Sequence, residues 1–188
     1  YNNESILYIA SLYSRREIIE ILLKANADVH FISQVHEIIY HSVARNQNEG
    51  CVSLFLNKGM NINERRDNGW TPLHDAVWQS NKENVLALID AGAFVNLKEE
   101  PRWLGNQQTE GWTPLHLAAW KNNTEIALTL INAGADINVL DNQGGTPFKV
   151  AYQLRYWKFC MTMLRLKFNH IFNKIDAKYL FALKKNRH

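Results

Sequence analysis

Residues 67–96 read DNGWTPLHDAVWQSNKENVLALIDAGAFVN, and residues 109–138 read TEGWTPLHLAAWKNNTEIALTLINAGADIN. A third version of the TPLH segment, Thr146-Pro147-Phe148-Lys149, begins 33 residues after Thr113. The interval from Thr71 to Thr113 is 42 residues, which is 33 plus an insertion of nine. Self-similarity at a fixed period of this length indicates a tandem-repeat architecture.

Glycine or asparagine recurs with the same period directly after apolar helical segments. The members of this slot are Asn26, Gly59, Gly92 and Gly134. A helix commonly ends with a residue in the left-handed conformation, which glycine adopts freely and asparagine tolerates. A second slot, held by Gly69, Gly111 and Gly144, is predicted to form a tight turn with positive φ. The period therefore persists where the TPLH letters are lost.

Each Thr-Pro pair is predicted to start a short helix. Threonine suits the N-cap, and proline suits the first helical position, where its missing N–H is harmless. A second helix should follow, because Val85, Leu88 and Ile89 form an apolar stripe at helical spacing. One such unit has too little apolar surface to fold alone, so consecutive units are expected to stack.

On these motifs the chain resembles the ankyrin repeat family. The resemblance implies an all-α fold, an ankyrin-repeat solenoid of helix-turn-helix units with short β-hairpin-like turns and a C-terminal capping helix. Copies are placed at residues 1–33, 34–66, 67–99, 109–141 and 142–174, with an insertion at about 100–108 and a basic tail at 175–188. The first two copies lack TPLH, and the fifth carries Lys149 and Lys167 in the histidine and glycine slots.

The 188 residues are 46% apolar, which suits one folded unit. No apolar run is long enough for a membrane span, and the charged residues near the start do not fit a secretion signal. We therefore expect an intracellular protein, cytoplasmic or nuclear, or one acting in a host cytoplasm if it is a viral or bacterial effector. The net charge of +3 hides an asymmetry, because residues 149–188 hold ten basic residues and a single acid.

Catalytic and metal-binding chemistry is not predicted. His41, His74 and His116 share one repeat position, where the family uses the imidazole to tie the turn backbones of neighbouring repeats together. Cys51 and Cys160 lack metal-ligand neighbours and are expected to be core residues. No P-loop, nucleophile elbow or dinucleotide fingerprint occurs. We expect no enzyme activity, no cofactor and no small-molecule substrate.

The resemblance implies binding of another protein through the concave face. Trp70 and Trp112 follow the turn glycines, and Trp78 and Trp120 follow the paired small residues of the first helix. These four indoles could form a contact strip, since tryptophan is enriched at binding hot spots, or could only pack. The predicted binding residues are Glu37, Arg45, Trp70, Trp78, Gln79, Trp103, Trp112, Trp120 and Lys121.

Trp103 lies in the nine-residue insertion, which is predicted to project as a longer finger. It could serve as an outlying anchor or fold back on the adjacent finger. A capping helix is predicted after the fifth copy, followed by a basic run, and the basic patch comprises Lys174, Lys178, Lys184, Lys185 and Arg187. This patch could be solvated, or it could bind nucleic acid or an anionic membrane, which is one alternative function. The other alternative is that the chain is the recognition domain of a larger effector or regulator. The protein is expected to be a monomer or part of a hetero-complex.

Overall fold

The computed structural model describes residues 5–13, 15–29, 39–45, 50–100, 102–104, 107–109 and 111–168. Its helices follow one another as hairpins. The inner helices are α1 (Ile6–Leu12), α3 (Ile39–Arg45), α5 (Pro72–Trp78), α7 (Pro114–Trp120) and α9 (Pro147–Gln153). The outer helices are α2 (Arg16–Lys24), α4 (Cys51–Leu56), α6 (Lys82–Asp90), α8 (Thr124–Asn132) and the helical residues 157–168.

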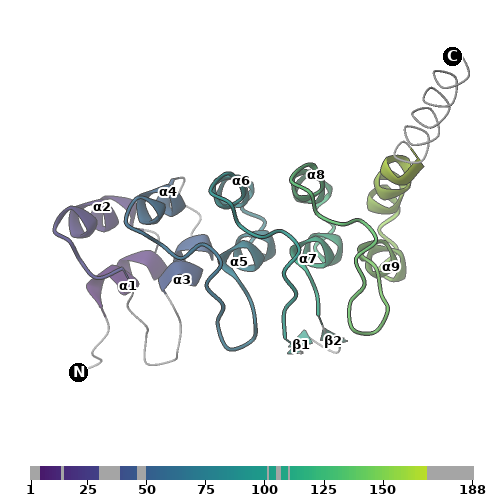
Figure 1. The fold of residues 1–188 in the computed structure, drawn as a ribbon, viewed down its shortest axis with the longest axis horizontal. Helices are drawn as coiled ribbons and strands as arrows, with labels where there is room; N and C mark the ends of the chain where they lie inside the picture. Colours follow the sequence, from purple (N-terminus) through teal and green to yellow (C-terminus); the bar gives the residue numbers. More distant parts are fainter. Residues whose placement is uncertain are drawn as a thin grey trace, which may run out of the picture.

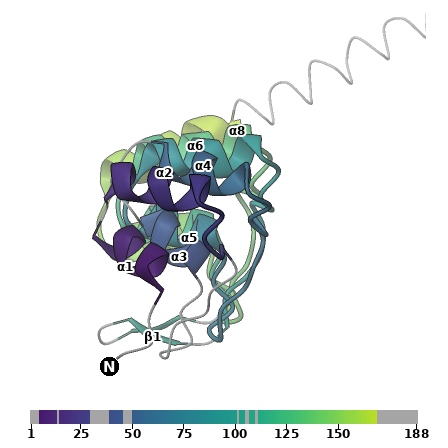
Figure 2. The same ribbon diagram turned by 90° about the vertical axis from the view of Figure 1, so that its left-hand side faces the viewer.

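Successive hairpins stack side by side. Inner helices pack on inner helices from α1 to α9, and outer helices pack on outer helices from α2 to α8. Figure 1 shows the two resulting rows, with long turns projecting below the inner row. The end-on view in Figure 2 shows two helix layers with these finger-like turns on one side. The predicted all-α solenoid is confirmed, because neighbouring copies cover each other's apolar faces.

The inserted residues form a finger that differs from the other turns. Strands β1 (Arg102–Leu104) and β2 (Gln107–Thr109) pair antiparallel, with Trp103 opposite Gln108. The side chains of residues 101–110 lie outside the description, so the position of the Trp103 indole stays untested. The insertion extends the finger without displacing the hairpins on either side, since α5 and α7 pack directly on each other.

Both left-handed slots occur where the period places them. The helix-end residues have φ of 57° at Asn26, 84° at Gly59, 91° at Gly92 and 92° at Gly134. The turn glycines have φ of 73° at Gly69, 72° at Gly111 and 71° at Gly144. In the fifth copy, Lys167 fills the first slot, and the helix continues through it to residue 168. A helix without a residue that readily turns left-handed has no local reason to stop there.

The core is a continuous apolar column along the stack. Leu73 and Leu115 hold the same position in adjacent inner helices, and both are buried. Cys51 and Cys160 are buried and free, as expected for core residues. In the part of the chain that the structure describes, no helix is both long and apolar enough to cross a membrane.

Buried histidine side chains cap the N-termini of the inner helices α5 and α7. The backbone N–H of Thr71 donates to Nδ1 of His74 at 3.1 Å, and that of Thr113 donates to Nδ1 of His116 at 3.2 Å. Nε2 of His116 lies 3.2 Å from the carbonyl oxygen of Gly145 in the next copy. Burial is the main cause that lowers the pKa of each of these two histidines to about 4. A neutral ring can accept at Nδ1 and donate at Nε2, so His116 links the fourth and fifth copies.

These pKa values predict acid destabilisation. The unfolded chain binds protons near the ordinary histidine pKa of about 6.5, whereas the folded chain does so near 4. The free energy of unfolding should therefore be highest above pH 6.5. Between pH 6.5 and 4 it should fall as the pH falls, by up to about 1.4 kcal/mol per pH unit for each histidine. Urea denaturation at several pH values measures this slope. The double variant His74→Gln/His116→Gln should reduce it, because glutamine can still reach the N-cap N–H and does not titrate. An unchanged slope in that variant would contradict the assignment.

Candidate functional site

Two of the four predicted strip tryptophans belong to the core. Trp70 is 2% exposed and Trp112 is 5% exposed, so for this pair the structure favours the packing alternative over the contact strip. Each ring stacks on the histidine of its own TPLH segment, with centroids 6.0 Å apart for Trp70 and His74 and 6.2 Å apart for Trp112 and His116. The indole that follows the turn glycine is therefore buried in the stack, where it packs on the imidazole of its own copy.

Other side chains contact the Trp70 ring on several sides. The guanidinium carbon of Arg66 lies 5.0 Å from its ring centroid, and the Trp78 ring contacts it edge-on at 5.8 Å. Its indole N–H donates to the carboxylate of Glu99, which is itself buried. Glu99 was not anticipated from the sequence. A glutamate in a turn is usually exposed, so the residue type did not indicate burial. The buried carboxylate is accommodated because Trp70 supplies a hydrogen-bond donor.

Trp78 and Trp120 lie at the surface of the inner helices. They end α5 and α7, and their rings stack with centroids 5.2 Å apart and planes at 20°. Both side chains are partly buried. The Lys121 ammonium lies 4.7 Å from the Trp78 ring centroid, within range of a cation–π interaction. Gln79 follows Trp78 and is also partly exposed. We call Trp78, Trp120, Gln79 and Lys121 the tryptophan platform.

Polar residues flank the platform along the inner helices. Arg45 ends α3 and Gln153 ends α9, so each occupies the repeat position of Trp78 and Trp120. Arg45 is partly buried, and burial lowers the pKa of its guanidinium. Gln153 is exposed. Aromatic character at this position is thus confined to the two central copies, whereas Glu37 lies outside the described residues.

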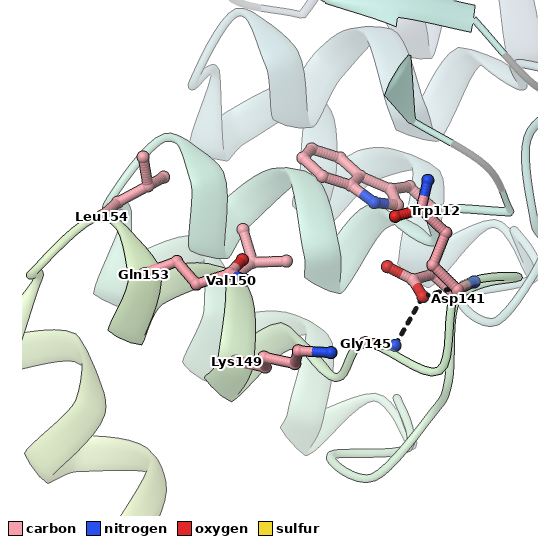
Figure 3. Close-up of a pocket in the computed structure, with 8 residues that line it drawn as sticks. Trp112, Asp141, Gly145, Lys149, Val150, Gln153 and Leu154 are labelled. Carbon is pink, nitrogen blue, oxygen red and sulfur yellow. Dashed lines mark hydrogen bonds between the residues drawn. The ribbon is translucent and has the colours of Figure 1, made fainter. Parts of the chain in front are cut away.

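A pocket of about 250 Å³ opens between the fourth and fifth copies. Figure 3 shows Trp112 and Asp141 on one side and Lys149, Val150 and Gln153 of α9 on the other. The Asp141 carboxylate accepts from the backbone N–H of Gly145 at 2.6 Å, which shapes the turn beside the pocket. An ammonium, an amide and a carboxylate at the rim, with apolar groups between them, suit a polar side chain of a bound segment.

A buried charge cluster joins the second and third copies. The Asp75 carboxylate lies 2.6 Å from Nδ1 of His41, 2.7 Å from Nη2 of Arg66 and 3.6 Å from Nη1 of Arg45. Asp75 occupies the position that Leu117 holds in the fourth copy, and both are fully buried. Asp75 was not predicted to be a core residue, and its equivalents Leu117 and Val150 are apolar. His41 was predicted to contact turn backbone, but its Nδ1 lies beside the Asp75 carboxylate instead.

The remaining predicted site residues are not placed by the structure. The Trp103 side chain is outside the description, and so is the basic patch of Lys174, Lys178, Lys184, Lys185 and Arg187. The capping helix predicted for residues 175–188 also lies there. Their proposed roles stay predictions from the sequence.

The cysteines and histidines that the structure describes are all buried. They contain no group of three or more His, Cys, Asp or Glu side chains that could hold a metal ion. Burial raises the pKa of the Cys51 and Cys160 thiols, which disfavours the reactive thiolate at neutral pH. The imidazoles of His41, His74 and His116, which could act as general bases if exposed, are buried within the stack.

Comparison with known families agrees with this architecture. Residues 7–99 match a family model described as ankyrin repeats in three copies, and residues 97–151 match one described as ankyrin repeats in many copies. The chain belongs to the ankyrin repeat family. Ankyrin repeats are generally protein–protein interaction modules, and the family is generally non-catalytic. Because one fold can serve many functions, the surface residues of an ankyrin stack decide which partner it binds.

The charge cluster yields a stability prediction for this ankyrin stack. Asp75→Asn keeps the shape of the side chain but leaves His41, Arg66 and Arg45 without their shared anion. We expect the free energy of unfolding to fall by roughly 3 kcal/mol, as when one partner of a buried ion pair is removed. Chemical denaturation measures the change. Asp90→Asn, an exposed site at the end of α6, is the matched control and should change stability by less than about 0.5 kcal/mol. Equal effects of the two variants would contradict the assigned role.

Proposed function

We propose that this ankyrin chain is a non-catalytic adaptor that binds a partner protein through its concave face, with the tryptophan platform as the central anchor. The carrying observation is the stacked pair of Trp78 and Trp120, which is partly exposed on the inner helices between the polar positions Arg45 and Gln153. An apolar centre with a polar rim is the usual anatomy of a protein interface.

The geometry of the platform supports an anchoring role. Stacking and the nearby Lys121 ammonium hold the rings in place, so little conformational entropy is lost when a partner covers them. The pocket beside α9 adds a polar subsite next to the apolar centre. A bound segment could place an apolar residue on the indoles and a polar side chain between Lys149 and Gln153.

The alternative function rests on a different part of the chain. Ten basic residues in 149–188 favour nucleic acid or anionic membrane through charge alone. The structure does not describe the basic patch itself. The aromatic platform is therefore the better supported site.

Partner capture tests the proposal. Purified wild-type chain and the double variant Trp78→Ala/Trp120→Ala are used as baits in lysate, and bound proteins are quantified by mass spectrometry. Loss of two central aromatic anchors should weaken capture of specific partners by about tenfold or more. Thermal melts should show that the double variant still folds cooperatively.

Trp157→Ala provides the matched control, because Trp157 is an exposed tryptophan outside the platform. This variant should capture the same proteins as the wild type. If the double variant folds and captures as well as Trp157→Ala, the platform is not the binding surface. Partners lost when salt is raised, regardless of the tryptophans, would instead support the basic alternative.

A further inference from the structure

The pocket between the fourth and fifth copies lies at a position that the two preceding copies fill with an indole. Trp70 and Trp112 follow the turn glycines, and each is buried against the histidine of its own copy. The residue that follows the turn glycine of the fifth copy is Gly145, which lines the pocket (Figure 3). The pocket of about 250 Å³ therefore lies where the fifth copy has no side chain of its own.

Other lining residues are the repeat equivalents of those around Trp70. The side chains that lie against the Trp70 ring are Arg66, His74 and Trp78. The fifth copy holds at these three positions the lining residues Asp141, Lys149 and Gln153. The backbones match as well, because the N–H of Arg66 donates to the carbonyl of Trp70 at 3.1 Å. The equivalent bond in the fifth copy runs from Asp141 to Gly145 at 2.8 Å. The pocket is thus the counterpart of the site that the Trp70 ring occupies.

The charges of the lining favour a neutral group with a hydrogen-bond donor. Oδ1 of Asp141 accepts from the backbone N–H groups of Gln143 and Gly145, at 2.9 and 2.6 Å. Oδ2 accepts no hydrogen bond from the described residues, and it lies 2.6 Å from the place where a Cβ on Gly145 would be. Lys149 carries the opposite charge at the same pocket. A charged side chain entering the pocket would meet one like charge, whereas a neutral donor would not.

We propose that this pocket binds an aromatic side chain of the partner, an indole in particular, as the third copy binds its own Trp70. The inference rests on the proposed function, because it names a residue of the segment that covers the concave face. An indole N–H can donate to Oδ2 of Asp141, and the Lys149 ammonium can approach the ring face. The apolar body of the ring can pack on Trp112 and Val150. Because an apolar cavity of about 150 Å³ binds benzene, a pocket of about 250 Å³ has room for this larger ring.

The position of the pocket next to the tryptophan platform sets a spacing for the partner segment. Trp120 ends α7 and Gln153 ends α9, and these two helices pack on each other. Packed helices lie about 8 to 10 Å apart, and an extended chain advances about 3.3 Å per residue. The partner class is therefore an extended segment with an apolar residue for the platform and an aromatic residue about three positions away.

Titration of the isotope-labelled full chain with N-acetyltryptophanamide, followed by two-dimensional NMR, tests the pocket directly. The amide signals of Gly145, Lys149 and Gln153 should shift saturably, with a dissociation constant of about 1 mM or tighter. N-acetylleucinamide lacks both the ring and the side-chain donor, so it should leave these signals unchanged at the same concentration. Equal shifts with the two amides, or no shift at these residues, would overturn the proposal.

A variant that fills the pocket from within sharpens the test. A Cβ on Gly145 would lie 2.6 Å from the Asp141 carboxylate, so the tryptophan is introduced together with a change at Asp141. Asp141→Arg/Gly145→Trp reproduces the Arg66–Trp70 pair of the third copy. It should melt cooperatively and bind the probe at least about tenfold more weakly. Leu140→Trp is the matched control, because it adds an indole to the same turn at an exposed position outside the pocket, and it should bind like the wild type. Undiminished binding by the folded double variant would contradict the assignment.

The pocket and the platform can fail separately in these experiments. Trp78→Ala/Trp120→Ala leaves every lining residue in place, so this variant should bind the probe like the wild type. If the probe binds but partner capture does not need the platform, the proposed function is wrong and the pocket assignment stands. If capture needs the platform but the probe does not bind, only the pocket assignment is wrong.

Discussion

No helical hairpin in this chain can bury its own apolar stripe, and the rest of the structure follows from that constraint. Each hairpin covers the face of the next, so stability is shared between neighbours along the stack. Leu73 and Leu115 are buried only because an adjacent inner helix lies over them. Among the described residues, the α1–α2 hairpin has one face that no other hairpin covers.

The joints between copies are chemically different although their geometry repeats. His116 reaches the Gly145 carbonyl of the next copy, as an uncharged link between turn backbones. His41 instead faces the Asp75 carboxylate, which also holds Arg66. A buried charge cluster is rarely better than apolar packing in stability, but it tolerates few alternative pairings. The joint between the second and third copies therefore contains buried charges, whereas the joint between the fourth and fifth copies contains an uncharged hydrogen bond.

The exposed surface is also a product of stacking. Trp78 and Trp120 are 42 residues apart in sequence, and their rings meet because α5 and α7 pack side by side. The nine inserted residues lie in a finger and do not disturb this contact. Binding by such a surface needs no special loop, because the rigid inner helices hold the anchors. Recognition then depends on which residues happen to occupy the last position of each inner helix.

The period, the helix starts and the left-handed positions could be predicted from the sequence, because they depend on local properties of Thr-Pro, glycine and asparagine. It also placed both cysteines in the core. It could not decide which tryptophans are exposed, since Trp70 and Trp78 are equally apolar and differ only in whether a histidine, an arginine and the Glu99 carboxylate surround them. The partners of Asp75 were hidden for the same reason, because they come from α3 and from the finger before α5. Local patterns fix the hairpin, whereas burial and pairing are decided only when neighbouring hairpins are brought into contact.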